Sequence, residues 1–161
     1  MAYQLFRRVF VLIFALFFRL EVQGRENIPM DGPFILCANH FSWWDPPLVG
    51  TLTKRFVRFM AKEELFKIPV LGKFFTIIQA FPVKRNTADR RAIRTALETL
   101  KNGHGLGIFP EGTRSRTNEL LPPQAGVAML AIKSKAPVVP IGIIGPYKLF
   151  RPVRVFIGTP L

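Results

Sequence analysis

The sequence predicts an α/β fold: a single domain with a largely parallel central sheet flanked by helices, preceded by an N-terminal helix at a membrane interface. The chain has 161 residues, of which 49% are hydrophobic, enough for one domain with a sizeable core. Short apolar segments bounded by Gly and Pro alternate with segments of helical periodicity, the pattern of a parallel sheet covered by helices. An apolar run of ten residues, 9–18, adds the N-terminal helix.

Residues 1–19 are expected to form a membrane-associating helix. The apolar run follows Arg7 and Arg8 and is closed by Arg19. It is too short to span a bilayer, which needs about 20 apolar residues. A helix lying in the interface, with its arginines toward lipid phosphates, fits this pattern. A buried core helix and the apolar part of a cleaved signal peptide remain open, although residues 19–24 contain no A-x-A cleavage site.

The first half of the chain then predicts two strands and two helices. Residues 20–23 and 34–38 have the composition of strands. Asp45 followed by Pro46 has the form of a helix N-cap with proline in the first turn, so a helix is expected to start there and run past Leu52. Residues 87–102 place their apolar side chains on one helical face. This helix would be capped by Asn86 or Thr87 and would end before Gly103.

The second half continues the alternation. Strands are expected at 106–109, 138–144 and 153–157, and a helix at 126–134. A shorter strand end is expected at 81–85. The elements from residue 20 to residue 161 therefore make one sheet-based domain.

The charge balance indicates an anionic partner. The 23 Lys and Arg against 10 Asp and Glu give a formal net charge of +13, which suits phosphate, nucleic acid or a lipid surface. Residues 54–91 carry much of this excess, and phenylalanines are interleaved with the cations between 56 and 75. This mixture favours an anionic membrane surface, and we expect no nucleic-acid partner, because no zinc-finger or RNP-type signature is present.

The cysteine and histidine content excludes two other kinds of site. Cys37 is the only cysteine, so an intrachain disulfide is impossible and a reducing cytosol is compatible with the chain. With two histidines and one cysteine, we expect no Cys/His metal site. We therefore expect a membrane-associated protein, monotopic or peripheral, on the cytoplasmic face.

The first candidate site follows the strand 34–38. His40 lies next to Asn39 and five positions before Asp45. A neutral imidazole held by a carboxylate can act as a general base. Two simpler interpretations stay open at this point: a structural, hydrogen-bonded histidine and an aspartate that only caps a helix. Ser42 lacks a G-x-S-x-G context, so it is expected to bond loop backbone rather than act as a nucleophile.

The second candidate site follows the strand 106–109. Gly112 allows a close backbone approach, Thr113 offers a hydroxyl and Arg114 can bind a phosphate. Glu111 is expected either to shape the site or to brace the loop through a salt bridge with an arginine. The strand end at 81–85 adds Arg85, which, like Arg114, could instead be solvated surface charge. Because functional residues gather at the carboxyl ends of parallel strands, these loops are expected to share one crevice.

Together the motifs resemble the glycerolipid acyltransferase family, particularly the 1-acylglycerol-3-phosphate acyltransferases. Asn39-His40 with Asp45 matches the NHxxxxD signature, and residues 109–114 match the FPEGTR signature. Arg85 stands at the basic position of the family's intermediate motif, and Val139-Pro140-Ile141 resembles its late V-P-[IV] strand. The resemblance covers most of the chain. It implies a glycerol-3-phosphate acyltransferase-like fold and transfer of a fatty acyl group from a thioester to the sn-2 hydroxyl of lysophosphatidate, forming phosphatidate in phospholipid biosynthesis.

The same resemblance assigns roles to the candidate residues. His40 is the expected base and Asp45 its orienting carboxylate. The expected substrate-binding residues are Arg85, Glu111, Gly112, Thr113 and Arg114.

No cofactor is expected, since the donor is already an activated thioester, either acyl-CoA or acyl carrier protein. Glycerol 3-phosphate or another lysolipid is an alternative acceptor, and a non-catalytic basic module that binds membrane or nucleic acid is the alternative of another class. Relatives usually continue into a C-terminal helical segment, so residues 20–161 are expected to be either a compact acyltransferase domain or one shortened at its C-terminus.

Overall fold

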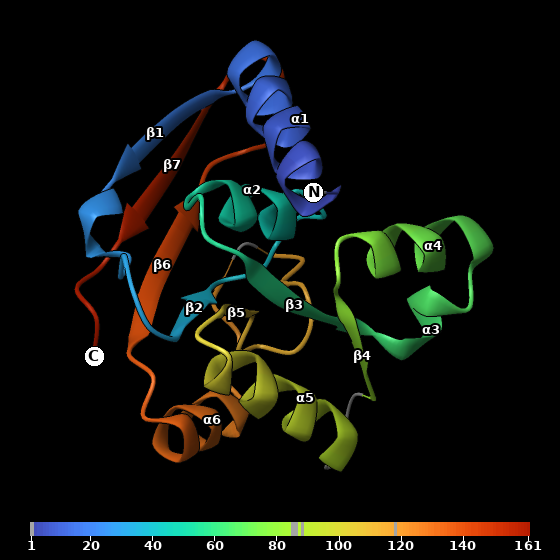
Figure 1. The fold of residues 1–161 in the computed structure, drawn as a ribbon. Helices are drawn as coiled ribbons and strands as arrows, with labels where there is room; N and C mark the ends of the chain where they lie inside the picture. The colour runs from blue at the N-terminus through green and yellow to red at the C-terminus, as the bar shows by residue number, and fades with distance from the viewer. Residues whose placement is uncertain (1, 85–86, 88, 118) are drawn as a thin grey trace.

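A seven-stranded sheet forms the centre of the computed structural model, which describes residues 2–84, 87, 89–117 and 119–161. The strand order is β1-β7-β6-β2-β5-β3-β4. Every pairing is parallel except that of β6 with β7. This confirms the expected α/β fold with a largely parallel sheet (Figure 1). The strands are β1 Arg19–Gln23, β2 Phe34–Ala38, β3 Val57–Lys62, β4 Phe81–Val83, β5 Gly105–Ile108, β6 Val138–Ile144 and β7 Pro152–Ile157.

Helices cover both faces of this sheet. Helices α1 and α2 lie on one face, α5 and α6 lie on the other, and α3 and α4 project beyond the edge strand β4 (Figure 1). The helices are α1 Ala2–Phe17, α2 Asp45–Thr51, α3 Glu63–Phe66, α4 Pro69–Ile77, α5 Arg90–Lys101 and α6 Gly126–Ser134, with a short 3-10 turn at Arg25–Asn27.

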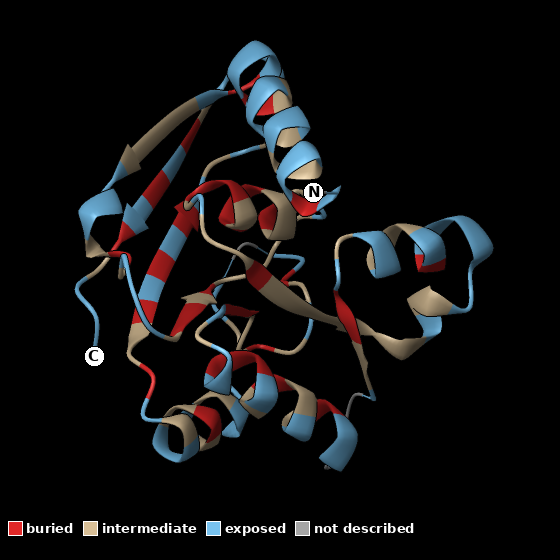
Figure 2. Cartoon of the chain, viewed as in Figure 1, coloured by how far each residue is buried: buried red, intermediate tan, exposed pale blue. Residues whose placement is uncertain are grey.

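The central strand β2 divides the hydrophobic core into two layers. Successive side chains of a strand point to opposite faces. Phe34 and Leu36 accordingly pack in the layer beneath α1 and α2, while Ile35 packs against α5 and α6. All three are fully buried. The outer strands β6 and β7 instead alternate buried and exposed residues, visible as bands in Figure 2. Core side chains therefore pack on both faces of the sheet at β2 but on only one face at β6 and β7.

Helix α1 has one face in the core and one face in solvent. Phe14 is fully buried and lies edge-on to Trp44, with ring centroids 5.9 Å apart. On the opposite face Leu5 and Leu12 are exposed over more than half of their surface. No helix in the described residues combines the length and the apolar character that crossing a membrane requires.

Two helix starts differ from the sequence expectation. Asp45 is the first residue of α2 and its carboxylate caps nothing in that helix, because Oδ2 accepts hydrogen bonds from the loop before it and Oδ1 accepts from a residue after β6. The N-cap of α5 is Asp89, whose carboxylate accepts from the amides of Arg91 and Ala92. Bonds to the amides of Lys84, Ala92 and Arg91 hold the pKa of Asp89 below its ordinary value. Thr87 bonds the Lys84 carbonyl instead, and Asn86, the other expected cap, lies outside the described residues.

The remaining differences are small shifts and one unpredicted stretch. The expected strand 106–109 begins and ends one residue earlier, and α2 ends at Thr51, short of Leu52. Strand β3 and the helices α3 and α4 were not expected, because cations alternate with apolar residues through this stretch and hide both periodicities.

Candidate active site

The candidate site lies at the carboxyl edge of the central strands. Strand β2 pairs in parallel with β5 on one side and with β6 on the other. Their carboxyl ends therefore lie side by side, and each leads into a loop that carries polar side chains. The loop after β2 contains His40, the loop after β5 contains Glu111, and the loop after β6 contains Tyr147.

His40 and Asp45 form a direct pair in this loop. The Nδ1 atom of His40 lies 2.9 Å from Oδ2 of Asp45, and the side chains are 12% and 0% exposed. The same Oδ2 also accepts from the backbone amides of Phe41 and Ser42, each at 2.7 Å. A buried carboxylate is stable only when donors replace its lost hydration. The tight loop supplies these donors and leaves Nε2 as the ring nitrogen of His40 that does not face Asp45.

Tyr147 completes the environment of Asp45 and was not predicted from the sequence. Its hydroxyl donates to Oδ1 of Asp45 at 2.7 Å. Burial, and then the charge of Asp45, raises the pKa of Tyr147 well above its ordinary value, so the phenol stays protonated and remains a donor. The signal available was its place just after β6, at the same sheet edge as His40.

Asn39 holds the His40 loop to the neighbouring strand. Its side-chain nitrogen donates to the carbonyl of Ile143 at 2.9 Å, and its side-chain oxygen accepts from the Ile143 amide at 2.7 Å. The side chain thus pairs with β6 as a strand residue would. These two hydrogen bonds fix Asn39, the residue directly before His40.

Glu111 braces the two motif loops against each other. Its carboxylate accepts from the amide of His40 at 2.9 Å and from the amide of Leu121 at 3.1 Å. The His40 carbonyl in turn accepts from the amide of Ser115 at 2.8 Å. Bracing was one of the two roles open for Glu111, and it was expected through a salt bridge with an arginine. Among the described residues no arginine pairs with Glu111, because its two oxygens are used by backbone amides.

An aromatic stack supports the imidazole from one side. The His40 ring lies over Phe109, with ring centroids 4.2 Å apart and planes 26° apart. Phe109 in turn stacks with Phe59 of β3. A side chain at Gly107 would collide with the Phe59 ring, so the glycine-rich strand β5 makes room for this stack. The orientation of His40 is therefore set by both hydrogen bonds and packing.

The rest of the second motif is more open. Gly112 has a φ of +68°, a left-handed conformation that favours glycine. Thr113 is exposed, and the Arg114 guanidinium lies 3.9 Å from the ring centroid of Trp43. All of these line the same cleft as His40. Arg85, the other expected phosphate ligand, lies outside the described residues.

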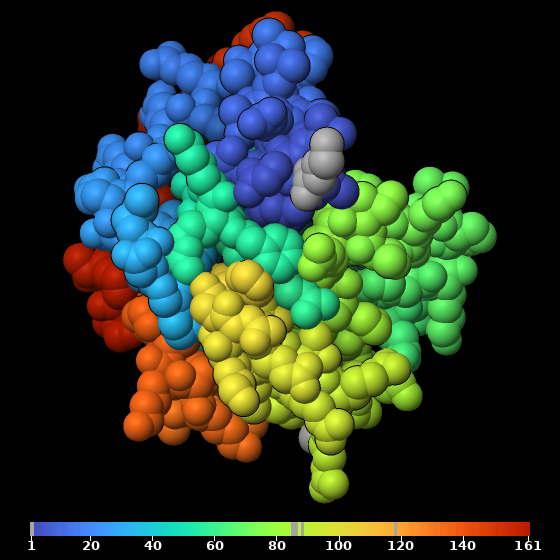
Figure 3. Space-filling view, in the orientation of Figure 1, coloured from blue at the N-terminus to red at the C-terminus, as the bar shows by residue number. Residues whose placement is uncertain are grey.

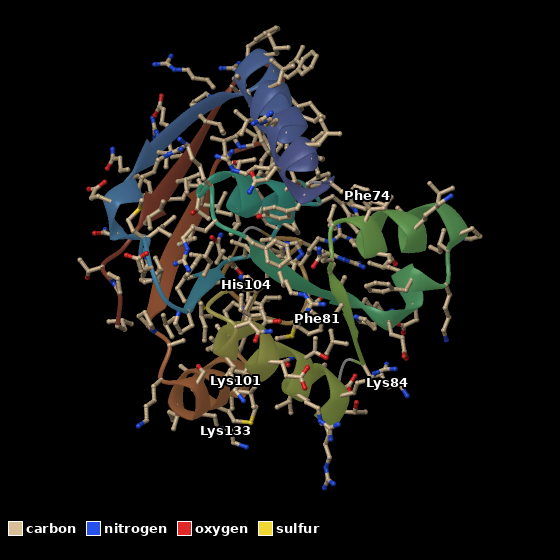
Figure 4. All side chains as sticks on the ribbon, in the orientation of Figure 1. Phe74, Phe81, Lys84, Lys101, His104 and Lys133 are labelled. Carbon is tan, nitrogen blue, oxygen red and sulfur yellow. The ribbon has the colours of Figure 1, made fainter. Side chains whose placement is uncertain are left out.

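The cleft is large, with a volume of about 1470 Å³. It extends from His40 between α1 and α4, where Phe6 and Phe74 meet with ring centroids 5.2 Å apart. Figure 3 shows α1 in blue beside α4 in green on one face, and Figure 4 shows Phe74 on the α4 side of this contact. Cations line it as well, among them Arg7, Lys84 and Arg114. The lining of the cleft thus combines aromatic and apolar side chains with cations.

Two further side chains that could react are those of Ser42 and His104. The Ser42 hydroxyl accepts from the Trp44 amide at 3.2 Å, which confirms that it bonds loop backbone. His104, labelled in Figure 4, is exposed in the turn after α5. Its ring lies edge-on to Phe56. In the described ranges, no three His, Cys, Asp or Glu side chains gather closely enough to hold a metal ion.

A histidine–carboxylate pair that opens onto a largely apolar cleft suits acyl transfer from an activated ester to a hydroxyl. Fold and site together define the class as an α/β O-acyltransferase. Comparison with known proteins narrows this class. The model of a family described as "Acyltransferase" matches residues 19–144, so the chain belongs to the acyltransferase family.

Individual relatives agree with this assignment. The chain is 36% identical over 148 residues to the 1-acyl-sn-glycerol-3-phosphate acyltransferase of Bacillus subtilis, covering 88% of this chain and 73% of that protein. The enzyme of the same name from Streptococcus pneumoniae is 32% identical over 145 residues, covering 88% and 53%. The crystal structure of the 1-acyl-sn-glycerophosphate (LPA) acyltransferase PlsC from Thermotoga maritima superposes with a TM-score of 0.79 at 32% identity, covering 99% of this chain and 68% of that one.

Proposed function

We propose that the protein transfers a fatty acyl group from a thioester to the sn-2 hydroxyl of lysophosphatidate and so forms phosphatidate. The names of the relatives support the acceptor and the product. The observation that carries the proposal is the pair of His40 and Asp45, joined at 2.9 Å at the wall of the cleft.

The chemistry of the step follows from this pair. With Nδ1 held by Asp45, Nε2 of His40 takes the proton of the acceptor hydroxyl as its oxygen attacks the thioester carbonyl. The new C–O bond forms, the C–S bond of the tetrahedral intermediate breaks, and the departing sulfur receives the proton from the imidazolium. Asp45 stabilises that imidazolium. General-base catalysis of this kind contributes about 10²- to 10⁴-fold.

The mixed lining of the cleft suits the two parts of a lysophospholipid. Arg114 offers a planar cation for the phosphate, with Gly112 and Thr113 beside it. Arg85 is proposed to join them on the basis of its motif. The aromatic side chains Phe6 and Phe74 suit an acyl chain. The presence of both cations and apolar surface in one cleft therefore supports an amphipathic acceptor.

Helix α1 is proposed to hold the enzyme at the cytoplasmic face of a membrane. Leu5, Leu12 and Leu16 are each more than half exposed on its outer face, and Arg8 is exposed nearby. Apolar side chains with cations at their border favour insertion among anionic lipids. The acceptor would then enter the cleft from the lipid phase. Either acyl-CoA or acyl carrier protein can supply the thioester.

The test offers lysophosphatidate with acyl-CoA, and separately with acyl carrier protein, to the wild type and to His40→Ala in lipid vesicles. We expect phosphatidate from the wild type with at least one donor and a loss of about 10²-fold or more in the variant. Glycerol 3-phosphate as acceptor forms a further arm.

Transfer to glycerol 3-phosphate alone would overturn the acceptor, and equal transfer by both proteins would overturn the role of His40. Salt-dependent membrane or nucleic-acid binding with no transfer would favour a non-catalytic module instead.

A further inference from the structure

Tyr147 reaches the reacting pair from outside both motif loops. It follows β6 and lies 102 positions after Asp45 in the chain, yet its hydroxyl donates to Oδ1 of Asp45 at 2.7 Å. Tyr147 is not part of the cleft lining. Its contact is therefore with the carboxylate and not with the space that a substrate would occupy.

The two carboxylate oxygens of Asp45 are held in different ways. Oδ2 accepts from His40 and from two loop amides, all within six residues of one another. Among the described residues, Tyr147 is the donor to Oδ1. A carboxylate held through one oxygen can still turn about its Cβ–Cγ bond, whereas a bond to the second oxygen fixes its plane. Asp45 is fully buried, so solvent does not substitute for the phenol.

The ring of Tyr147 is itself held in place. It lies edge-on to Phe18 with centroids 5.8 Å apart, and it packs against Phe41 at 5.6 Å. Phe18 is buried directly after α1, and Phe41 is the residue after His40. The hydroxyl is thus positioned by packing that does not depend on its own hydrogen bond.

We propose that Tyr147 is a positioning residue for acyl transfer, which fixes the plane of the Asp45 carboxylate and draws part of its charge away from His40. This rests on the function proposed above, with His40 as the base. The other titratable group that contacts the pair in the described part of the chain is Glu111, which bonds the His40 amide. The nearby cation Arg114 lies on Trp43.

Removing the hydroxyl has two expected effects. In Tyr147→Phe the ring packing stays, but Oδ1 loses its donor and the carboxylate is free to turn, so kcat falls about fivefold to tenfold while KM for both substrates is unchanged. More carboxylate charge then faces the imidazole and favours its protonated form. The acidic limb of the kcat profile consequently moves to higher pH, by about 0.5 to 1 unit.

The chain offers a matched control in its other tyrosine. Tyr3 is buried, and its hydroxyl bonds the backbone at Val57 and Arg55, so it has no contact with Asp45. Tyr3→Phe therefore loses a comparable buried hydroxyl, and we expect it to lower the unfolding temperature without moving the pH profile. Thermal unfolding of both variants separates damage to the fold from damage to the site.

A double-substitution cycle gives the decisive measurement. If Tyr147 acts through Asp45, Tyr147→Phe causes no further loss of kcat when it is added to Asp45→Asn. Equal fold-losses in both backgrounds, or an unmoved pH profile in Tyr147→Phe, would overturn the positioning role. Activity retained by His40→Ala would instead overturn the role of His40 as base, and no acyl transfer by the wild type would overturn the proposed function itself, so these failures are distinguishable.

Discussion

The loops after β2 and β5 leave the same edge of the sheet but are held very differently. In the first loop the side chains of Asn39, His40 and Asp45 are all hydrogen-bonded, and Asp45 is fully buried. In the second loop Glu111 is buried and bonded, while Thr113 is exposed and Arg114 rests on Trp43. The difference indicates that the fold itself orients the pair of His40 and Asp45, and under the proposed function the substrate would complete the phosphate side. Preorganisation is most valuable where bonds form and break.

The largest effect is expected from Asp45→Asn, which removes the carboxylate at the centre of the loop after β2. The amide cannot support the imidazolium, so kcat should fall about 10³- to 10⁴-fold with little change in KM. Steady-state kinetics of vesicle-bound enzyme measures this. Asp31→Asn, at an exposed aspartate before β2, is the control. A loss below tenfold would mean that this loop does not carry the chemistry.

Glu111→Gln tests the brace between the two loops. Glutamine has a single carbonyl oxygen for the two amides that Glu111 accepts from, so one partly buried amide loses its acceptor. We expect a loss of about 1 to 3 kcal/mol in the free energy of unfolding, together with a lower kcat because His40 shifts. Denaturant unfolding and kinetics check both. Glu119→Gln, at an exposed position, should change neither the free energy of unfolding nor kcat. An unchanged kcat in Glu111→Gln would mean that the brace between the two loops does not affect His40.

Arg114→Ala probes the open loop. Because this guanidinium is expected to bind phosphate and not the reacting atoms, KM for lysophosphatidate should rise about tenfold with kcat within about twofold. Arg94→Ala, at an exposed position on α5, serves as the charge control. A fall in kcat with constant KM would mean that Arg114 acts on the chemical step, as the loop after β2 is expected to. It would contradict the proposed difference between the two loops.

Gly112→Ala should have the smallest effect. The substitution forces a side chain into a φ of +68° and against the Gln124 side chain, so stability should fall by about 1 to 2 kcal/mol. Gly103 has a φ of +73° with open space around it, so Gly103→Ala reports the strain alone. Chemical denaturation of both variants gives the difference. Equal losses of stability in the two variants would mean that the Gln124 side chain moves aside at little cost and that the loop after β5 is flexible there.

The sequence predicted those parts of the molecule whose determinants are local. The bounds of β2, α6 and β6 agree with expectation, because apolar runs there stand between clear breaks. The pairing of His40 with Asp45 was predictable since five positions separate them. Tyr147 and the Asn39 bonds to Ile143 were not, because those contacts join residues 102 and 104 positions apart. Long-range partners depend on strand order, which periodicity alone does not specify.

The bonds of Asn39 and Asp45 to the β6 region also carry a consequence for how the site assembles. Loop closure over such sequence distances comes late in folding, so the buried carboxylate of Asp45 gains its Tyr147 donor only after β6 has docked beside β2. The Phe41 and Ser42 amides, which donate to that carboxylate, should therefore exchange their protons only through global unfolding. Hydrogen exchange at these two amides would then report when the site assembles during folding.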